Sequence, residues 1–130
     1  MKRKKYLIDT NYFIRALTND DEIRSPIAQK FFLDLQLQNF EAQSDISVIA
    51  EVVYVLTKSR YLLSRSETTT RLSALILIDN LEIYLKLIVL DSLAFFANSK
   101  LDFVDCYLLT LAKEMDLELI TFDLELAKLI

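Results

Sequence analysis

Four short apolar stretches recur along this chain, and longer segments with helical periodicity separate them. The stretches lie at residues 6–8, 40–43, 83–85 and 119–122. Short apolar runs between helical segments are typical of strands that are buried in a parallel sheet. Two helical segments follow each of the first three stretches, and a final helix follows the fourth. The sequence therefore predicts an α/β fold with a mainly parallel sheet that helices cover on both faces.

Length and composition fit one compact domain over residues 1–130. The chain is 53% hydrophobic and 26% charged, which is typical of a globular protein with a substantial core. Its apolar runs, such as residues 74–78 and 87–90, are far shorter than the roughly 20 residues that span a bilayer. A single cysteine, Cys106, excludes an internal disulfide and fits a reducing compartment. We expect a cytoplasmic protein that makes no use of a membrane.

Two residue types are missing, and their absence restricts the chemistry. The chain has no histidine, which excludes Ser-His-Asp triads and histidine-rich zinc sites. It has no glycine, which excludes the glycine-rich loops that bind nucleotide phosphates. Carboxylates, hydroxyls and basic side chains remain. Carboxylates that bind a hard cation are therefore the main candidates for a functional site.

Several acidic residues stand at positions where a surface charge is unexpected. Asp9 and Asp123 each directly follow an apolar stretch, and Glu51 lies within a helix rich in valine and isoleucine. Asp102 and Asp105 are three residues apart and share a helix face. Because parallel strands end at the same edge of a sheet, these acids are expected to converge there. A bound Mg²⁺ or Mn²⁺ would offset their repulsion and would allow hydrolysis of a phosphodiester.

Each acid also has a simpler structural interpretation. Asp9, Asp102 and Asp123 are all suited to capping the helix that follows them, and Glu51 fits the solvent side of its helix. The basic side chains that fit phosphate contacts fit solvated surface charge equally well; they are Arg15, Lys58, Arg60, Arg65 and Lys100. The N-terminal basic run, residues 2–5, is expected to be a solvated terminus. The net charge of −4 leaves any RNA-binding surface unidentified.

Four motifs stand in order along nearly the whole chain. They are Leu-Ile-Asp-Thr-Asn at 7–11, Ala-Glu-Val-Val-Tyr-Val-Leu at 50–56, Leu-Asp-Phe-Val-Asp at 101–105 and Leu-Ile-Thr-Phe-Asp at 119–123. In this set of motifs the chain resembles the PIN-domain ribonucleases, and among them the VapC-type toxins of toxin–antitoxin pairs. It departs from the family in the connector at residues 61–64, where relatives usually carry glycine.

The resemblance implies a fold, an activity and a set of partners. The fold is a PIN-like three-layer α/β/α sandwich with a central sheet of four to five strands. The activity is that of an endoribonuclease that depends on Mg²⁺ or Mn²⁺ and cleaves RNA, with tRNA a plausible substrate. The implied partners are a cognate antitoxin and a second copy in a homodimer. The implied catalytic and metal-binding residues are Asp9, Glu51, Asp105 and Asp123; the supporting residues are Thr10, Asn11, Asp102 and Thr121; Arg15 and Lys100 are substrate-binding candidates.

Two other functions compete with the ribonuclease. A PIN-like scaffold without catalysis would act through protein contacts alone, and its failure to bind divalent ions would distinguish it. A receiver-type or phosphatase domain would use Asp9 as phosphoacceptor. Phosphatases of the haloacid-dehalogenase type need a second aspartate two residues later, where this chain has Asn11.

Overall fold

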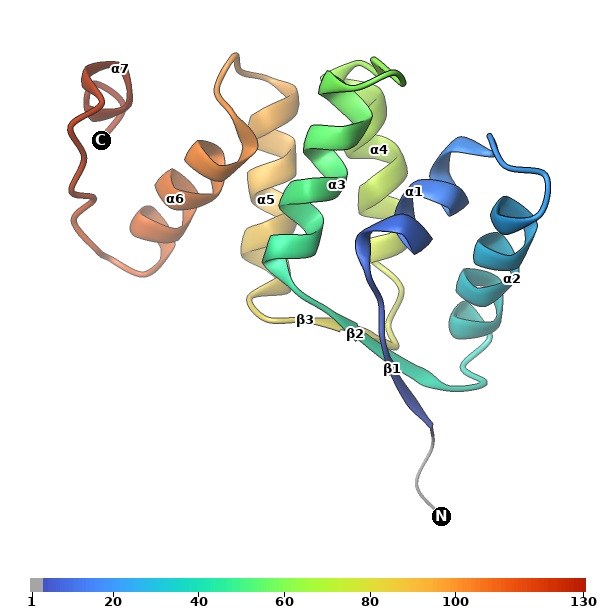
Figure 1. The fold of residues 1–130 in the computed structure, drawn as a ribbon. Coiled ribbons are helices and arrows are strands. Elements are labelled where there is room, and N and C mark those ends of the chain that lie inside the picture. Colours follow the sequence, from blue (N-terminus) through green and yellow to red (C-terminus); the bar gives the residue numbers. More distant parts are fainter. Residues whose placement is uncertain (1–3) are drawn as a thin grey trace.

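The computed structural model describes residues 4–130, as three strands and seven helices (Figure 1). The basic run at 2–5 lies partly outside the described residues. The elements are β1 (Lys5–Leu7), α1 (Thr10–Thr18), α2 (Arg24–Gln36), β2 (Glu41–Ser44), α3 (Ile46–Lys58), α4 (Arg65–Ile76), β3 (Leu81–Ile83), α5 (Lys86–Ala97), α6 (Phe103–Glu114) and α7 (Leu124–Ala127). Among the described helices, none combines the length and apolar character needed to cross a membrane.

The three strands form one parallel sheet in the order β1-β2-β3. Tyr6 stands opposite Ala42, and Ala42 opposite Leu81, in a continuous row across the sheet. The α/β class and the parallel direction are thus confirmed. The expected number of strands was wrong, because the fourth apolar stretch, residues 119–122, forms no strand within the described chain. It follows α6 as an extended segment away from the sheet (Figure 1).

The helices gather on one side of this sheet (Figure 1). Ala42, Ser44, Leu81 and Ile83 face them and are buried, while the alternate residues Glu41, Gln43 and Glu82 are exposed. This alternation is typical of a sheet with one covered and one solvated face. The second face of the expected three-layer sandwich is therefore uncovered in the described part of the molecule.

The core lies between the sheet and α1, α3, α4 and α5. Phe13, Ile49, Leu56, Leu72 and Leu93 are completely buried there, and such residues supply most of the hydrophobic stabilisation. On α3 the buried positions Ile49, Val52, Val53 and Leu56 recur at helical spacing, as the sequence pattern predicted.

Three of the seven described helices, α3, α4 and α7, begin at a residue whose side chain caps them. Asp45 caps α3 by accepting from the Ser47 amide, and Ser64 caps α4 by accepting from the Glu67 amide, as is typical of residues with short polar side chains at helix starts. The third strand lies two residues before its predicted position at 83–85. Leu85 adopts a left-handed conformation with φ of 56° and starts α5, so the chain leaves the sheet after Ile83.

Candidate active site

Asp9 stands at the carboxyl end of β1, directly before α1. It occupies the N-cap position of α1 in an extended conformation, but its carboxylate accepts no capping hydrogen bond from that helix. The capping role that the sequence allowed is therefore not taken by this side chain. The exposed Asp9 carboxylate stands at the edge of the sheet where open α/β domains place their ligand sites.

Thr10 connects this strand end to Glu51 on α3. The Thr10 hydroxyl Oγ1 donates to Glu51 Oε2 at 3.0 Å, across 41 residues of sequence. Two of the predicted motifs, the Asp-Thr-Asn turn and the Glu-bearing helix, therefore meet at this point. Glu51 is exposed, and Thr10 gives its carboxylate a fixed orientation relative to Asp9.

The strand ends behind these residues are tied together by Ser44. Its buried hydroxyl donates to the carbonyl oxygen of Ile8 at 3.0 Å, and the Ile8 amide donates to the carbonyl oxygen of Gln43 at 2.9 Å. These bonds fix the residue before Asp9 against the end of β2. This role of Ser44 in positioning Asp9 was not predicted from the sequence.

Asp102 and Asp105 occupy the start of α6. Asp102 is the N-cap residue, again without a side-chain capping bond, and Asp105 lies in the first turn. Burial raises the pKa of Asp105 above its usual value, and the negative charges of Asp102 and Asp123 raise that pKa further. Both carboxylates line a hollow of about 450 Å³ between α3 and α6.

Asp123 and Thr121 lie on the C-terminal segment. Asp123 Oδ1 accepts from the amides of Glu125 and Leu126 at 3.0 and 3.1 Å, and Thr121 Oγ1 accepts from the Asp123 amide at 3.0 Å. Asp123 thus caps α7, the alternative that the sequence left open for it. Because the fourth strand is not formed, Asp123 does not stand beside Asp9 at the sheet edge.

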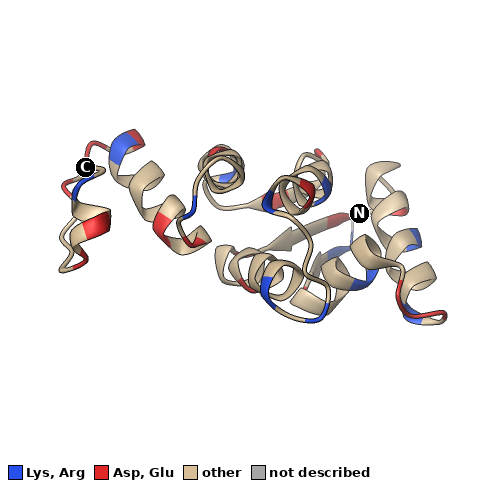
Figure 2. Cartoon of the chain, turned by 90° about the horizontal axis from the view of Figure 1, so that it is seen from above, with Lys and Arg blue, Asp and Glu red and all other residues tan. Residues whose placement is uncertain are grey.

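The carboxylates therefore form two groups, one at Asp9 and Glu51 and one at Asp102 and Asp105, and Asp123 is near enough to the second group for its charge to act on Asp105. Within residues 4–130, no three acidic, histidine or cysteine side chains lie close enough to hold one metal ion. Acidic positions are spread over several elements of the molecule (Figure 2). The predicted convergence of four acids is only partly present.

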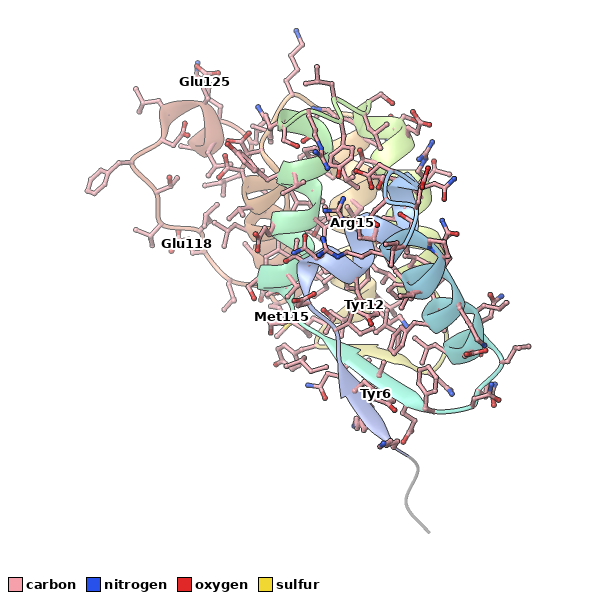
Figure 3. The ribbon with its side chains drawn as sticks, turned by 45° about the vertical axis from the view of Figure 1, so that its right-hand side comes forward. Tyr6, Tyr12, Arg15, Met115, Glu118 and Glu125 are labelled. Carbon is pink, nitrogen blue, oxygen red and sulfur yellow. The ribbon has the colours of Figure 1, made fainter. Side chains whose placement is uncertain are left out.

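Arg15, a predicted substrate-binding residue, is engaged within the protein. It lies on α1 (Figure 3), and its guanidinium pairs with Asp20 Oδ2 at 3.0 Å. Arg60 pairs with the same oxygen at 2.9 Å, and the Tyr61 hydroxyl donates to it at 2.6 Å. Asn11 lies close by and shares a surface hollow with Asp9 and Arg15.

The other basic candidates differ in their availability. Arg65 donates to the carbonyl oxygens of Phe96 and Leu101 at 3.1 and 2.6 Å and lies over the Phe96 ring. Lys58 and Lys100 are exposed and belong to none of the ion pairs of the described chain. Lys58 lines the same hollow as Asp102 and Asp105, which makes it the basic residue best placed for a phosphate near these acids.

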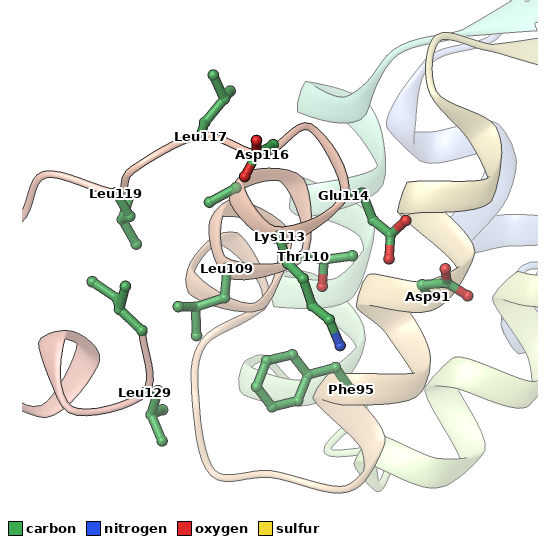
Figure 4. A pocket seen from close by; sticks show the side chains of 12 residues that line it. Asp91, Phe95, Leu109, Thr110, Lys113, Glu114, Asp116, Leu117, Leu119 and Leu129 are labelled. Carbon is green, nitrogen blue, oxygen red and sulfur yellow. The ribbon is translucent and has the colours of Figure 1, made fainter.

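A larger hollow of about 670 Å³ lies between α5, α6 and the C-terminal segment (Figure 4). Phe95 on α5, Leu109 on α6 and Leu117 of the C-terminal segment line it. It exists because the C-terminal segment stands away from α5 and α6, and no motif acid lines it.

The parallel sheet, with Asp9 and Glu51 held at its carboxyl edge, defines an α/β domain whose site lies where such domains bind ligands. The chain matches the PIN domain model over residues 6–129 and therefore belongs to the PIN domain family. PIN domains are generally nucleases and usually bind divalent metal ions. No match was found among curated proteins or solved structures.

Proposed function

We propose that this chain is an endoribonuclease that depends on Mg²⁺ or Mn²⁺ and serves as the toxin of a VapC-type toxin–antitoxin pair. The observation that carries the proposal is the hydrogen bond from Thr10 to Glu51 in a chain of the PIN family. It joins the first two acidic motifs at the carboxyl edge of the sheet. RNA, with tRNA as a plausible target, is the proposed substrate.

The donor chemistry of the motif residues fits such a metal. Asp9, Glu51, Asp105 and Asp123 offer only carboxylate oxygens, the ligands that Mg²⁺ prefers and Mn²⁺ accepts. Because no three of them are close enough to hold one ion in the described structure, the proposal requires α6 to approach Asp9 and Glu51 when metal binds. The raised pKa of Asp105 is expected to fall on binding, because a cation stabilises its charged form.

When bound, the metal would lower the pKa of a coordinated water and stabilise charge on the phosphate. The protein's own residues would position the reacting groups. Thr10 holds the Glu51 carboxylate in one orientation, and Asp102 keeps negative charge beside Asp105. Lys58, on the wall of the same hollow, would contact a substrate phosphate.

An RNA cleavage assay tests this activity. End-labelled tRNA is incubated with the protein in Mn²⁺, with and without EDTA, and with the variants Asp9→Asn and Glu51→Gln. The proposal predicts cleavage that EDTA abolishes and that each substitution lowers by roughly 100-fold or more. Asp34→Asn, an exchange in a surface ion pair with Lys30, is the matched control and should keep full activity. Full activity of Asp9→Asn would refute the assignment.

The toxin role and the antitoxin have a separate test, which measures growth. Expression of the wild type should arrest growth, and expression of Asp9→Asn should not. Coexpression of a cognate antitoxin should restore growth. RNA cleavage in vitro without growth arrest would support the ribonuclease activity and refute the toxin role.

The separation of the acids favours one competing function, a PIN-like scaffold that binds proteins without catalysis. Calorimetric titration with Mn²⁺ separates the two. The ribonuclease predicts binding that weakens in Asp9→Asn and is unchanged in Asp34→Asn. The scaffold predicts no binding in any of the three proteins.

A further inference from the structure

The hollow between α3 and α6 combines apolar walls with a few charged groups. Two buried phenylalanines, Phe96 and Phe103, line it, and their rings pack edge to face with 6.2 Å between the centroids. The carboxylates of Asp102 and Asp105 and the amine of Lys58 also line it. Apolar surface with a small number of polar groups is typical of ligand sites. A ligand that fits this hollow combines a flat apolar group with negative charge.

Tyr54 on α3 lines the same hollow, and its ring is largely free. The residue is 65% exposed. Within residues 4–130, the ring of Tyr54 takes part in none of the aromatic pairs and carries none of the cations that lie over a ring. Aromatic rings bury a large area when a flat group stacks on them. Tyr54 therefore offers a stacking surface at the wall of the hollow.

Tyr54 belongs to a stripe of three exposed side chains on α3. Tyr54 and Lys58 follow Glu51 by three and seven residues, and all three are exposed. Residues at this spacing share one face of a helix. With the helical rise per residue, Tyr54 lies about 4.5 Å and Lys58 about 10.5 Å beyond Glu51 along the axis. The stripe presents, in order, a carboxylate that Thr10 orients, an aromatic ring and a cation.

This order of groups matches the order of chemical groups along an RNA strand, where a base lies between one phosphate and the next. Proteins that bind single strands stack bases on aromatic rings and contact phosphates with basic side chains. If the reacting phosphate lies at the acids, the neighbouring base reaches Tyr54 and the following phosphate reaches Lys58. Lys58 belongs to none of the ion pairs of the described chain, so its charge is available for this contact.

We propose that Tyr54 is the platform on which the base beside the scissile phosphate stacks, and that Lys58 binds the phosphate beyond this base. The proposal rests on the proposed function, because the acids fix where the scissile phosphate lies. Tyr54 is then a specificity-determining residue. A base must be unpaired to stack on it, and a purine, which has the larger ring surface, is favoured over a pyrimidine at this position.

A tryptophan at position 54 reports stacking without any need for cleavage. The chain contains no tryptophan, so the tryptophan emission of Tyr54→Trp comes from this position alone. The variant is titrated with a 2′-O-methyl oligoadenylate in Ca²⁺, and the length of the oligonucleotide is checked afterwards. The emission should be quenched as the complex forms. Leu33→Trp is the matched control, at an exposed position of α2 on the far side of α1 from α3 (Figure 1), and its emission should not change.

Affinity measurements separate the ring from the charge. Binding of the same oligonucleotide, fluorescently labelled, is followed by anisotropy at several salt concentrations. Tyr54→Ala should weaken binding by about 5- to 100-fold, Tyr54→Phe should stay within about twofold of the wild type, and Leu33→Ala should bind as the wild type does. Lys58→Gln should lower the slope of log affinity against log salt concentration by about one, whereas Tyr54→Ala should leave this slope unchanged.

Several results would overturn the platform. They are unchanged emission of Tyr54→Trp, equal quenching of Leu33→Trp, and an RNA affinity of Tyr54→Ala equal to that of the wild type, which would leave this face to a protein partner. Failure of the platform is distinguishable from failure of the proposed function. Metal-dependent RNA cleavage without quenching of Tyr54→Trp would refute the platform and leave the activity intact. Quenching in a protein whose wild type cleaves no RNA would support the platform and refute the ribonuclease.

Discussion

Asp20 is predicted to contribute more to stability than any other charged residue in a described ion pair. It follows α1, and its carboxylate accepts from Arg15, Arg60, Tyr61 and Thr18 at 2.6–3.1 Å. These partners join the end of α1 to the connector after α3. The substitution Asp20→Asn keeps the size of the side chain and one acceptor oxygen, but it removes the negative charge from this network.

The burial of the pair sets the expected magnitude. The side chains of Asp20 and Arg15 are 25% and 20% exposed, so the pair lies between the exposed class, worth about 0–1 kcal/mol, and the buried class, where loss of one partner costs about 3–5 kcal/mol. We expect Asp20→Asn to lower the free energy of unfolding by about 2–3 kcal/mol. For a chain of this size, that corresponds to a decrease in Tm of roughly 8–12 °C.

The pH dependence gives this prediction a specific signature. Hydrogen bonds from Thr18, Tyr61 and Arg15, together with the Arg15 charge, outweigh burial and hold the pKa of Asp20 well below its usual range. A lowered folded-state pKa gives stability that is present above the unfolded value, about 3.9, and is lost as the pH falls toward the folded value. The difference between wild type and Asp20→Asn should therefore be constant from pH 7 to about pH 5 and shrink below about pH 4.

Urea unfolding at several pH values measures this difference, with Asp34→Asn as the control. Asp34 pairs at 3.0 Å with Lys30, whose side chain is 75% exposed. This single pair within one helix should contribute only about 0.5 kcal/mol. Equal destabilisation by the two substitutions, or a difference for Asp20→Asn that does not shrink in acid, would refute the reasoning.

Three shorter predictions follow from single contacts. Leu62 lies in the connector with φ of 46°, a conformation that glycine adopts without steric cost. Leu62→Gly should therefore raise the free energy of unfolding by about 1 kcal/mol. Urea titration measures this, and an unchanged midpoint would contradict it. Thr10→Val removes the hydrogen bond to Glu51. Calorimetric titration should show several-fold weaker Mn²⁺ binding, and the Tm should be unchanged. An Mn²⁺ affinity equal to that of the wild type would show that Thr10 does not orient Glu51. Arg65→Met removes the hydrogen-bond donors to the carbonyl oxygens of Leu101 and Phe96. The free energy of unfolding should fall by about 2 kcal/mol, as measured by thermal unfolding. A Tm equal to that of the wild type would contradict this.

Helix periodicity and capping residues made the helical part of the fold predictable. The stripe of Ile49, Val52 and Leu56 on α3 specifies a buried face, and the caps at Asp45 and Ser64 fix where α3 and α4 begin. These signals depend on residues that are close in sequence, so they can be recognised from the sequence alone. The α/β class followed because short apolar runs between helices leave few other arrangements.

Strand pairing was less predictable because it depends on distant residues. Residues 119–122 have the composition of a strand, yet they form none in the described chain. A strand needs a partner edge, and the direction of the chain after Asp116 decides whether the edge of β1 is within reach. Leu85 likewise looked like a strand residue, but its left-handed conformation ends β3 early. Sequence patterns indicate whether a strand residue faces the core or the solvent, but they do not indicate which strand lies beside it.

The candidate site was predictable to the extent that it depends on strand and helix ends. Asp9 at the end of β1, Glu51 on α3 and Asp105 in the first turn of α6 all stand in the elements that the motifs indicated. The convergence of all four acids was not predictable, because it depends on where Asp123 goes. The hydrogen bond from Ser44 to the Ile8 carbonyl oxygen was also not predictable, because a serine near the end of a strand is equally typical of a helix cap.

The metal dependence of RNA cleavage tests the central claim most directly. The initial rate of tRNA cleavage is measured as a function of Mn²⁺ concentration for the wild type, Asp105→Asn and Asp34→Asn. A carboxylate-bound metal site predicts a saturable rate for the wild type and the Asp34→Asn control, and a rate about 100-fold lower or worse for Asp105→Asn at every concentration. Cleavage that is independent of Mn²⁺, or that is equal in all three proteins, would contradict the account.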